Sequence, residues 1–520
     1  METPPLESQE VRKHRLRWWT LGVLCLSVLV VVIDSSILNV ALPTLQRDLG
    51  ASASGLQWIV TSYILILGGL LLTTGSLGDR FGRAMMLRTG LVVFALASLT
   101  AAYMDSAGQL IAARAVMGLG AAMIVPSTLS IAVDVFKGEE RTKAIAIWAA
   151  LNAVGIVLGP IFGGLILEHL HWGWIFLVNL PIAAVAILAG MMLITESRDP
   201  EAKPLDIPGA FLSMVAVSSL VYAIIQGPDE GWTSRYVLIC FAIAVVTGAA
   251  FVIREMRARY PLLDLSFFKR RRFTVGAMAL SLQSLALAGI MFGFTLYLQF
   301  VQGYSPLEAG VRFLPLAAGL MIGARSSERL VHRFGTTKVI ASGLLLMAAT
   351  LPLMMLWQAD SPYWLVGVVF AVIGFGVGNV AVPSVDAIMG AVPESKAGVA
   401  SATNSVIRMV GGALGIAVIG SIMNSLYAGK VASAVATLPP EYAEAAKNNV
   451  GAAVKIAESL PGESGQALFS AAGNAFADAM GEVGIISAVV MAVTAVIVLV
   501  FMPSRAENGA ETKLSPEDKP

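Results

Sequence analysis

Three charged side chains stand inside long apolar runs of this 520-residue chain: Asp34, Arg114 and Arg408. An ionised group in the hydrocarbon core of a membrane costs several kcal/mol, so a residue of this kind is functional by default. A carboxylate beside an arginine favours its charged form, and it binds a proton more readily once the arginine has moved away. These residues therefore point to proton chemistry within a membrane.

Asp34 and Arg114 are expected to lie at the same depth. The first predicted helix runs outward and the fourth runs inward, and each charge lies about six residues, or roughly 9 Å, from the outer end of its helix. When the pair separates, or when a substrate cation competes, the proton affinity of Asp34 changes, so proton and substrate would occupy the protein alternately. The alternative is a permanent structural ion pair.

The runs around these charges are long enough to cross a bilayer. The chain is 57% hydrophobic and 13% charged, whereas roughly 25% charged residues are usual in soluble proteins. A span needs about 20 apolar residues. The sequence predicts an all-α polytopic membrane protein of fourteen helices, which start near Trp18, Leu56, Met85, Gly108, Lys143, Gly173, Asp206, Arg235, Phe273, Leu307, Lys338, Tyr363, Ala400 and Gly481.

The distribution of basic residues predicts the orientation. Most of the 35 Lys and Arg residues fall on one side if the N-terminus is inside, and an even number of spans puts both termini on that side. Both termini are therefore expected in the cytoplasm. The largest basic block, from Arg254 to Arg272, is interpreted as a topological anchor; binding of nucleic acid or anionic lipid is the alternative, and no nucleic-acid partner is implied.

A weak internal repeat divides the chain into halves. Val125-Pro126-Ser127 is echoed by Val382-Pro383-Ser384, and Arg80-Phe81-Gly82 by Arg333-Phe334-Gly335. We expect two six-helix halves related by the repeat. The predicted domains are a tail (1–17), an N-terminal half (18–195), two inserted helices (206–253), a C-terminal half (273–503) and a second tail (504–520). An outer loop at 426–480 would form either a cap with two short amphipathic helices or a solvated loop.

The loop after the second helix reads GSLGDRFGRAMML from Gly75, and it resembles the signature between helices two and three of the major facilitator superfamily. The matching residues include Gly75, Gly78, Asp79, Arg80, Gly82 and Arg83, while Ala84 departs from the basic residue often found there. The resemblance implies a conformational switch whose ion pairs exchange as the halves rock, with Asp134 as a partner of Arg80 or Arg83. A static turn is the alternative.

The fifth helix contains GIVLGPIFGG, which is similar to the antiporter motif carried by exporters of the superfamily. Its residues are Gly155, Gly159, Pro160, Gly163 and Gly164. Glycines spaced by four form one bare stripe, and the proline bends the helix. The alternative is an ordinary packing seam.

The stretch from Val32 to Pro43, around Asp34, resembles the first-helix signature of the fourteen-helix drug:proton antiporter family. A substrate cavity is predicted among aromatic and polar residues of the spans, with packing as the alternative interpretation. Its candidates are Tyr63, Gln283, Tyr297, Asn404 and Arg408.

Taken with these residues, the resemblance implies a secondary active exporter in the bacterial cytoplasmic (inner) membrane. It would exchange protons for drugs or other amphipathic toxic compounds by alternating access, and it would work as a monomer. No catalysis, cofactor or metal is expected, because the sequence has no phosphate-binding loop and no Cys/His spacing typical of a metal site. Alternatives are a narrow-specificity carrier of a single metabolite or antibiotic, sodium coupling, and a membrane-embedded enzyme or receptor.

Overall fold

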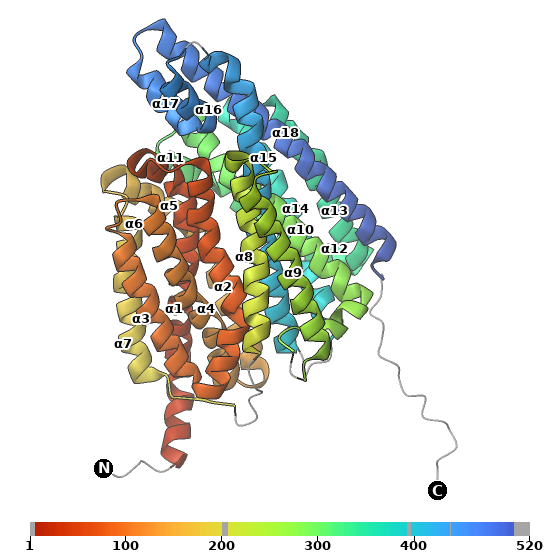
Figure 1. Cartoon of the computed structure of the whole chain (residues 1–520). Coiled ribbons are helices and arrows are strands. Elements are labelled where there is room, and N and C mark those ends of the chain that lie inside the picture. Colours follow the sequence, from red (N-terminus) through yellow and green to blue (C-terminus); the bar gives the residue numbers. More distant parts are fainter. Residues whose placement is uncertain (1–5, 200–205, 260, 393–396, 437, 504–520) are drawn as a thin grey trace.

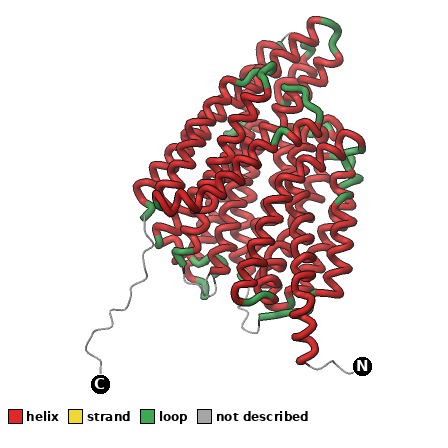
Figure 2. Tube along the Cα trace, turned by 180° about the vertical axis from the view of Figure 1, so that it is seen from behind, coloured by secondary structure: helices red, strands yellow, loops and turns green. Residues whose placement is uncertain are grey.

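The computed structural model describes residues 6–199, 206–259, 261–392, 397–436 and 438–503, and within them it contains helices and loops but no strand (Figure 2). The N-terminal half consists of α1 (Leu6–Leu49), α2 (Ala53–Phe81), α3 (Arg83–Ala101), α4 (Ala107–Val135), α5 (Gly138–His169), α6 (Trp174–Leu177) and α7 (Asn179–Leu193). Two helices follow, α8 (Ile207–Glu230) and α9 (Arg235–Arg257).

The C-terminal half begins with the 3-10 segment η1 (Leu265–Lys269). It continues with α10 (Arg271–Leu296), η2 (Tyr297–Val301), α11 (Pro306–Val311), α12 (Leu314–Phe334), α13 (Thr336–Thr350), η3 (Leu351–Leu356), α14 (Tyr363–Met389), α15 (Ala397–Val435), α16 (Pro440–Asn448), α17 (Val450–Ser459) and α18 (Glu463–Phe501). The helices form one long bundle, with α8 lying along the border between the halves (Figure 1). We call the end where α1 begins and α18 ends the terminal face, and the end that carries α16 and α17 the cap face.

Thirteen of the helices in the described part of the chain are long and apolar enough to cross a membrane. The all-helical membrane fold predicted from the sequence is therefore confirmed. The helix α5 has 32 residues but is not among the thirteen, so the count of fourteen stays a prediction.

The two halves repeat the same glycine contacts. Gly82 (φ 132°) joins α2 to α3, and Gly335 (φ 86°) joins α12 to α13; both need a left-handed backbone that side chains disfavour. A Cβ atom added to Gly120 of α4 would lie 2.9 Å from a carbonyl oxygen of α3, and one added to Gly376 of α14 would lie 3.0 Å from a carbonyl oxygen of α13. Bare glycines thus let each helix pair touch backbone to backbone.

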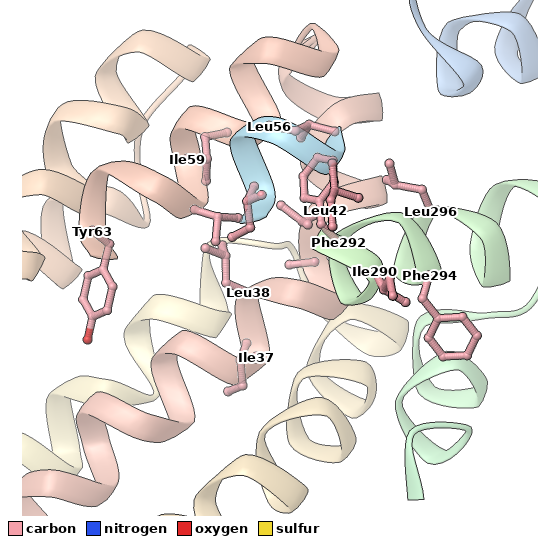
Figure 3. Close-up of a cluster of buried hydrophobic side chains, with 14 of the residues drawn as sticks. Ile37, Leu38, Leu42, Leu56, Ile59, Tyr63, Ile290, Phe292, Phe294 and Leu296 are labelled. Carbon is pink, nitrogen blue, oxygen red and sulfur yellow. The ribbon is translucent and has the colours of Figure 1, made fainter. Parts of the chain in front are cut away.

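Several contacts join the two halves toward the cap face. α11 packs on α5, where Leu307 meets Gly164, and Gln299 donates a hydrogen bond of 2.8 Å to the Val40 carbonyl oxygen. Leu56 of α2 lies with Phe292 of α10 in the apolar cluster of Figure 3, and both line one small cavity. The bundle is closed on this side.

The cap face differs from the sequence expectation in its helix ends. α18 begins at Glu463, whereas its start was expected near Gly481, and α15 continues to Val435. A helix rich in alanine stays helical beyond the bilayer, because its backbone hydrogen bonds do not depend on lipid. As a result, helix occupies most of the stretch 426–480, in which α16 and α17 are the two short helices (Figure 1).

Candidate functional site

A buried ion pair joins α1 to α4. Arg114 Nη1 lies 2.5 Å from Asp34 Oδ2, and both side chains are 1% exposed. The Arg114 Nε atom also donates to the Ile59 carbonyl oxygen at 3.4 Å. The structure thus brings together Asp34 and Arg114, which were expected to meet because they lie at the same depth in their helices. Because removing one partner would leave an uncompensated buried charge, the pair holds α1 and α4 together.

An asparagine that the sequence analysis did not single out completes this site. Asn179, at the start of α7, donates a hydrogen bond of 2.9 Å to Asp34 Oδ1 and another of 3.0 Å to Ser98 Oγ of α3. Ser98 in turn donates to the Phe176 carbonyl oxygen at 2.8 Å. The carboxylate on α1 is therefore held directly by α4 and α7, and Asn179 is in turn held by α3. The only sign of Asn179 in the sequence was a single amide side chain within an apolar run.

Tyr63 belongs to the same cluster. The Arg114 guanidinium carbon lies 4.2 Å from the centre of the Tyr63 ring, a cation–π distance, and the Tyr63 hydroxyl lies 3.5 Å from the Val31 carbonyl oxygen. Gly118 of α4 allows this approach, because a Cβ atom there would lie 2.6 Å from the Tyr63 carbonyl oxygen. Tyr63 is 1% exposed, so its expected place on a cavity wall is corrected: in this conformation it packs against the ion pair.

The loop between α2 and α3 has a different ion pair from the one expected. Arg83 at the start of α3 donates to Asp79 near the end of α2 at 2.8 Å, and Arg80 lies over the Phe81 ring at 5.6 Å. Asp134 is exposed and forms no ion pair with either arginine among the described contacts. The predicted pairing with Asp134 is therefore not made in this conformation, since Asp79, on the other side of the turn at Gly82, already pairs with Arg83.

Glu196 fastens the same loop from the end of the N-terminal half. Its carboxylate accepts hydrogen bonds from the backbone N–H groups of Ala84 and Met85, both at 3.0 Å. The N-terminus of α3 carries free N–H groups that attract a negative charge. Ser197 accepts a further bond from the Arg83 backbone N–H at 3.0 Å. Glu196 therefore positions the loop.

The glycines of α2 in this motif face α3 and α4. A Cβ atom at Gly75 would lie 3.5 Å from Pro126, and one at Gly78 would lie 3.7 Å from both Met86 and Ser127. These are ordinary contact distances, so the glycines set a close but unstrained packing between α2 and its neighbours.

The glycine stripe of α5 packs on the helix that carries Asp34. Cβ atoms built on Gly155 and Gly163 would lie 2.8 Å from Val32 and 3.1 Å from Ile37, and one on Gly159 would collide with Ser36. The Ser36 hydroxyl also donates to the Gly155 carbonyl oxygen at 3.1 Å.

The end of the α5 stripe touches the other half instead. Gly164 meets the backbone of Leu307, and the Pro160 carbonyl oxygen meets Gly310, both in α11. The end of the α5 motif therefore forms the surface on which α11 of the other half packs at the cap face.

Of the remaining cavity candidates, Gln283 and Tyr297 are buried. Gln283 donates to the Val377 carbonyl oxygen at 3.1 Å, and the Tyr297 hydroxyl donates to the Gln358 carbonyl oxygen at 2.8 Å. Tyr297 also stacks on Trp357, with ring centres 5.3 Å apart. Their contacts are those of packing residues.

Arg408 on α15 has an exposed side chain, and it makes no ion pair with a described residue. Ile407 and Gly411 face α10, and Met409 faces α2. At 100° per residue, Arg408 lies between the contact with α10 and the contact with α2. Asn404, one turn earlier, is 9% exposed, and its Oδ1 atom has no hydrogen-bond partner among the described residues. Arg408 is the one residue of the five predicted for the cavity whose side chain is exposed in this conformation.

No group of three possible metal ligands occurs in the described part of the chain. A model of the Major Facilitator Superfamily matches residues 24–416, which is most of the chain and includes the ion pair and both motifs. The chain belongs to the major facilitator superfamily. Its two matched halves and its glycine contacts are consistent with that membership.

Named transporters of the superfamily are similar over nearly their whole length. The multidrug efflux pump LfrA of Mycolicibacterium smegmatis is 37% identical over 93% of this chain and 96% of its own. The tetracenomycin C resistance and export protein of Streptomyces glaucescens is 34% identical, covering 93% of this chain and 91% of its own. The methyl viologen resistance protein SmvA of Salmonella typhimurium is 33% identical, covering 88% of this chain and 93% of its own.

The fold matches that of a solved transporter structure. A bacterial homologue of the human lysosomal transporter Spinster, crystallised in an inward-facing and unoccupied conformation, superposes with a TM-score of 0.65 at 18% sequence identity. The match covers 93% of this chain and 98% of that one. The family match and the similarity to these efflux and resistance proteins point to a membrane transporter.

Proposed function

We propose that this chain is a drug exporter that exchanges protons for amphipathic toxic compounds across the bacterial cytoplasmic membrane, as a fourteen-helix drug:proton antiporter. The observation that carries the proposal is the carboxylate of Asp34, held in the membrane by Arg114 and Asn179. Relatives named for multidrug efflux and antibiotic resistance support the choice of substrate.

The ion pair supplies a means of coupling. While Arg114 stays on Asp34, the carboxylate is compensated and has no need of a proton. If rocking of the halves or the arrival of a cationic substrate draws Arg114 away, a bare carboxylate in an apolar setting must bind a proton or a cation. Proton and drug then compete for one negative charge, which is the requirement for exchange. The hydrogen bonds from Asn179 keep the carboxylate in place during this competition.

Alternating access supplies the direction of transport. We assign the terminal face to the cytoplasm, with both termini there, so that the closed cap face is the outer one and the carrier takes up substrate from inside. Export then requires α11 to separate from α5 at Gly164 and Pro160. On the cytoplasmic side, Arg83 would exchange Asp79 for Asp134 as the halves close there.

Ethidium efflux tests the proposal. Purified carrier in liposomes with an imposed pH gradient is compared with Asp34→Asn and with Asp48→Asn, a control that removes an exposed carboxylate from the same helix. We expect efflux to follow the pH gradient in the native protein and in the control, and to vanish in Asp34→Asn. Full gradient-driven efflux by Asp34→Asn would end the proton-coupling assignment, and efflux driven by a sodium gradient instead would replace it.

A second candidate function is export of a single antibiotic. Relatives named for resistance to tetracenomycin C, puromycin or methylenomycin A favour it. A panel of unrelated toxic cations separates the two functions, because a multidrug carrier lets them compete with one another, whereas a narrow carrier does not.

We also propose that a single protomer forms the transport unit. Such a monomer should keep its full activity per chain when each liposome holds one copy.

A further inference from the structure

A small cavity lies beneath α17, between the two halves. It has a volume of about 20 Å³, which is room for a single water molecule. Its wall combines polar and aromatic side chains from both halves, among them Gln46, Gln57, Phe292, Tyr427, Asn449 and Phe476. The cavity therefore lies between the two halves on the side of the cap face.

The helices α16 and α17 form a lid over this cavity, and one residue fastens the lid to the opposite half. Asn449 accepts a hydrogen bond from Gln46 at the end of α1, donates one of 3.1 Å to the Ala51 carbonyl oxygen, and caps α17 through the Ala452 N–H at 3.0 Å. The Tyr427 hydroxyl ties α16 to α15 by donating to the Ala446 carbonyl oxygen at 2.9 Å. The lid belongs to the C-terminal half and is fastened to the N-terminal one.

Two amide oxygens in the cavity wall lack partners. Gln46 and Gln57 are 7% and 2% exposed, and the Oε1 atom of each has no hydrogen-bond partner among the described residues. Buried polar groups are nearly always paired, because leaving one unpaired costs roughly 1–3 kcal/mol. Both glutamines line the cavity, so the unused acceptors are available to whatever enters it.

We propose that the space beneath this lid is an outer binding subsite for flat organic cations that carry N–H groups. The two amide oxygens accept hydrogen bonds from the N–H groups, and the rings of Phe292, Tyr427 and Phe476 hold the cationic face. The subsite rests on the proposed export function and deepens it. A drug needs a pocket of about 300 Å³ or more, so the subsite opens only when Asn449 releases Gln46 and Ala51.

Inhibition from the outside tests the subsite. Ethidium, which carries N–H groups, is added to the medium on the cap side of liposomes during efflux, and tetraphenylphosphonium, which has none, is added in a parallel series. We expect both to inhibit native efflux. In Gln57→Leu, the ethidium concentration needed for half inhibition should rise about tenfold, equivalent to about 1.4 kcal/mol, while that of tetraphenylphosphonium should change less than twofold.

Equal losses for the two probes, or native efflux that external ethidium does not inhibit, would overturn the subsite while leaving the export function intact. Absence of native efflux would instead count against the proposed function.

A crosslink tests the lid. In a background with Cys25→Ser and Cys240→Ser, cysteines replace Gln46 and Asn449 in one variant, and Lys430 and Glu482 in a control. The control pair is an ion pair of 2.8 Å between α15 and α18, within one half. Oxidation should stop efflux in the first variant only, and reduction should restore it. Continued efflux by the oxidised Gln46/Asn449 variant would show that the lid stays shut during export and would overturn the proposal.

Discussion

Arg114 reaches Asp34 across 80 residues of sequence at 2.5 Å, and each side chain is 1% exposed. The two charges cancel in a place where neither is tolerated alone. This makes the pair both a fastening between α1 and α4 and a point at which any competing charge has a large effect.

Breaking this pair from one side should destabilise the protein more than removing both charges. Arg114→Leu leaves a buried carboxylate uncompensated, for which we expect a loss of about 3–5 kcal/mol in unfolding free energy. Asp34→Asn combined with Arg114→Leu should lose clearly less. Thermal unfolding in detergent measures both. A double variant as unstable as the sum of its single variants would mean that the two side chains do not interact.

Packing between α3 and α4 should depend on Gly120. A Cβ atom there would lie 2.8 Å from Phe94 Cβ, so Gly120→Ala should lower the unfolding free energy by about 1–3 kcal/mol through overpacking. Gly108→Ala, on the same helix with nothing within 4 Å of the added atom, is the control and should leave the melting temperature unchanged. Similar melting temperatures for the two variants would contradict the backbone contact.

The attachment of the loop between α2 and α3 should weaken without Glu196. Glu196→Gln keeps one acceptor oxygen but removes the charge at the N-terminus of α3. Hydrogen exchange of the Ala84 and Met85 amides should then speed up by about three- to fivefold, measured by mass spectrometry. Glu168→Gln, an exposed change at the end of α5, is the control and should leave these amides unaffected.

Cations should bind more tightly when the unpaired charge of Arg408 is removed. At about 6 Å and an effective dielectric constant between protein and water, its repulsion of a monocation is on the order of 1 kcal/mol. Arg408→Gln should therefore tighten ethidium binding about three- to tenfold, and that of a matched dication by about the square of that factor. Arg408→Lys retains the charge and should bind as the native protein does. Fluorescence titration of purified carrier distinguishes these cases.

Most of the candidate site was predicted from charged residues that stand within apolar runs. This pattern located Asp34 and Arg114 and their common depth, and the length of the apolar runs gave the all-helical membrane fold. Asn179 was missed because an amide in such a run has no charge to mark it, and only the folded chain shows that α7 delivers it to α1. Glu196 was missed because loop carboxylates are common and mostly solvated.

The errors have physical causes as well. Asp134 was expected to meet Arg83 because both lie near the same end of their helices, but in this conformation Asp79, just before the turn between α2 and α3, lies closer and pairs with Arg83. Tyr63 was expected on a cavity wall because its ring offers a flat face for cation–π contact, whereas in this conformation that ring covers the Arg114 guanidinium. The start of α18 was misplaced because apolarity marks the membrane boundary and not the end of the helix.

The length of α15 and α18 turns a small rotation of the C-terminal half into a large displacement at the cap face. Each has 39 residues, and at 1.5 Å per residue each is about 58 Å long, so a tilt of about 10° moves one end by about 10 Å relative to the other. The hydrogen bonds of Asn449 tolerate a displacement of well under 1 Å. A small rotation of the C-terminal half is therefore amplified at its far tip, and the outer exit unfastens before the centre of the bundle has moved far.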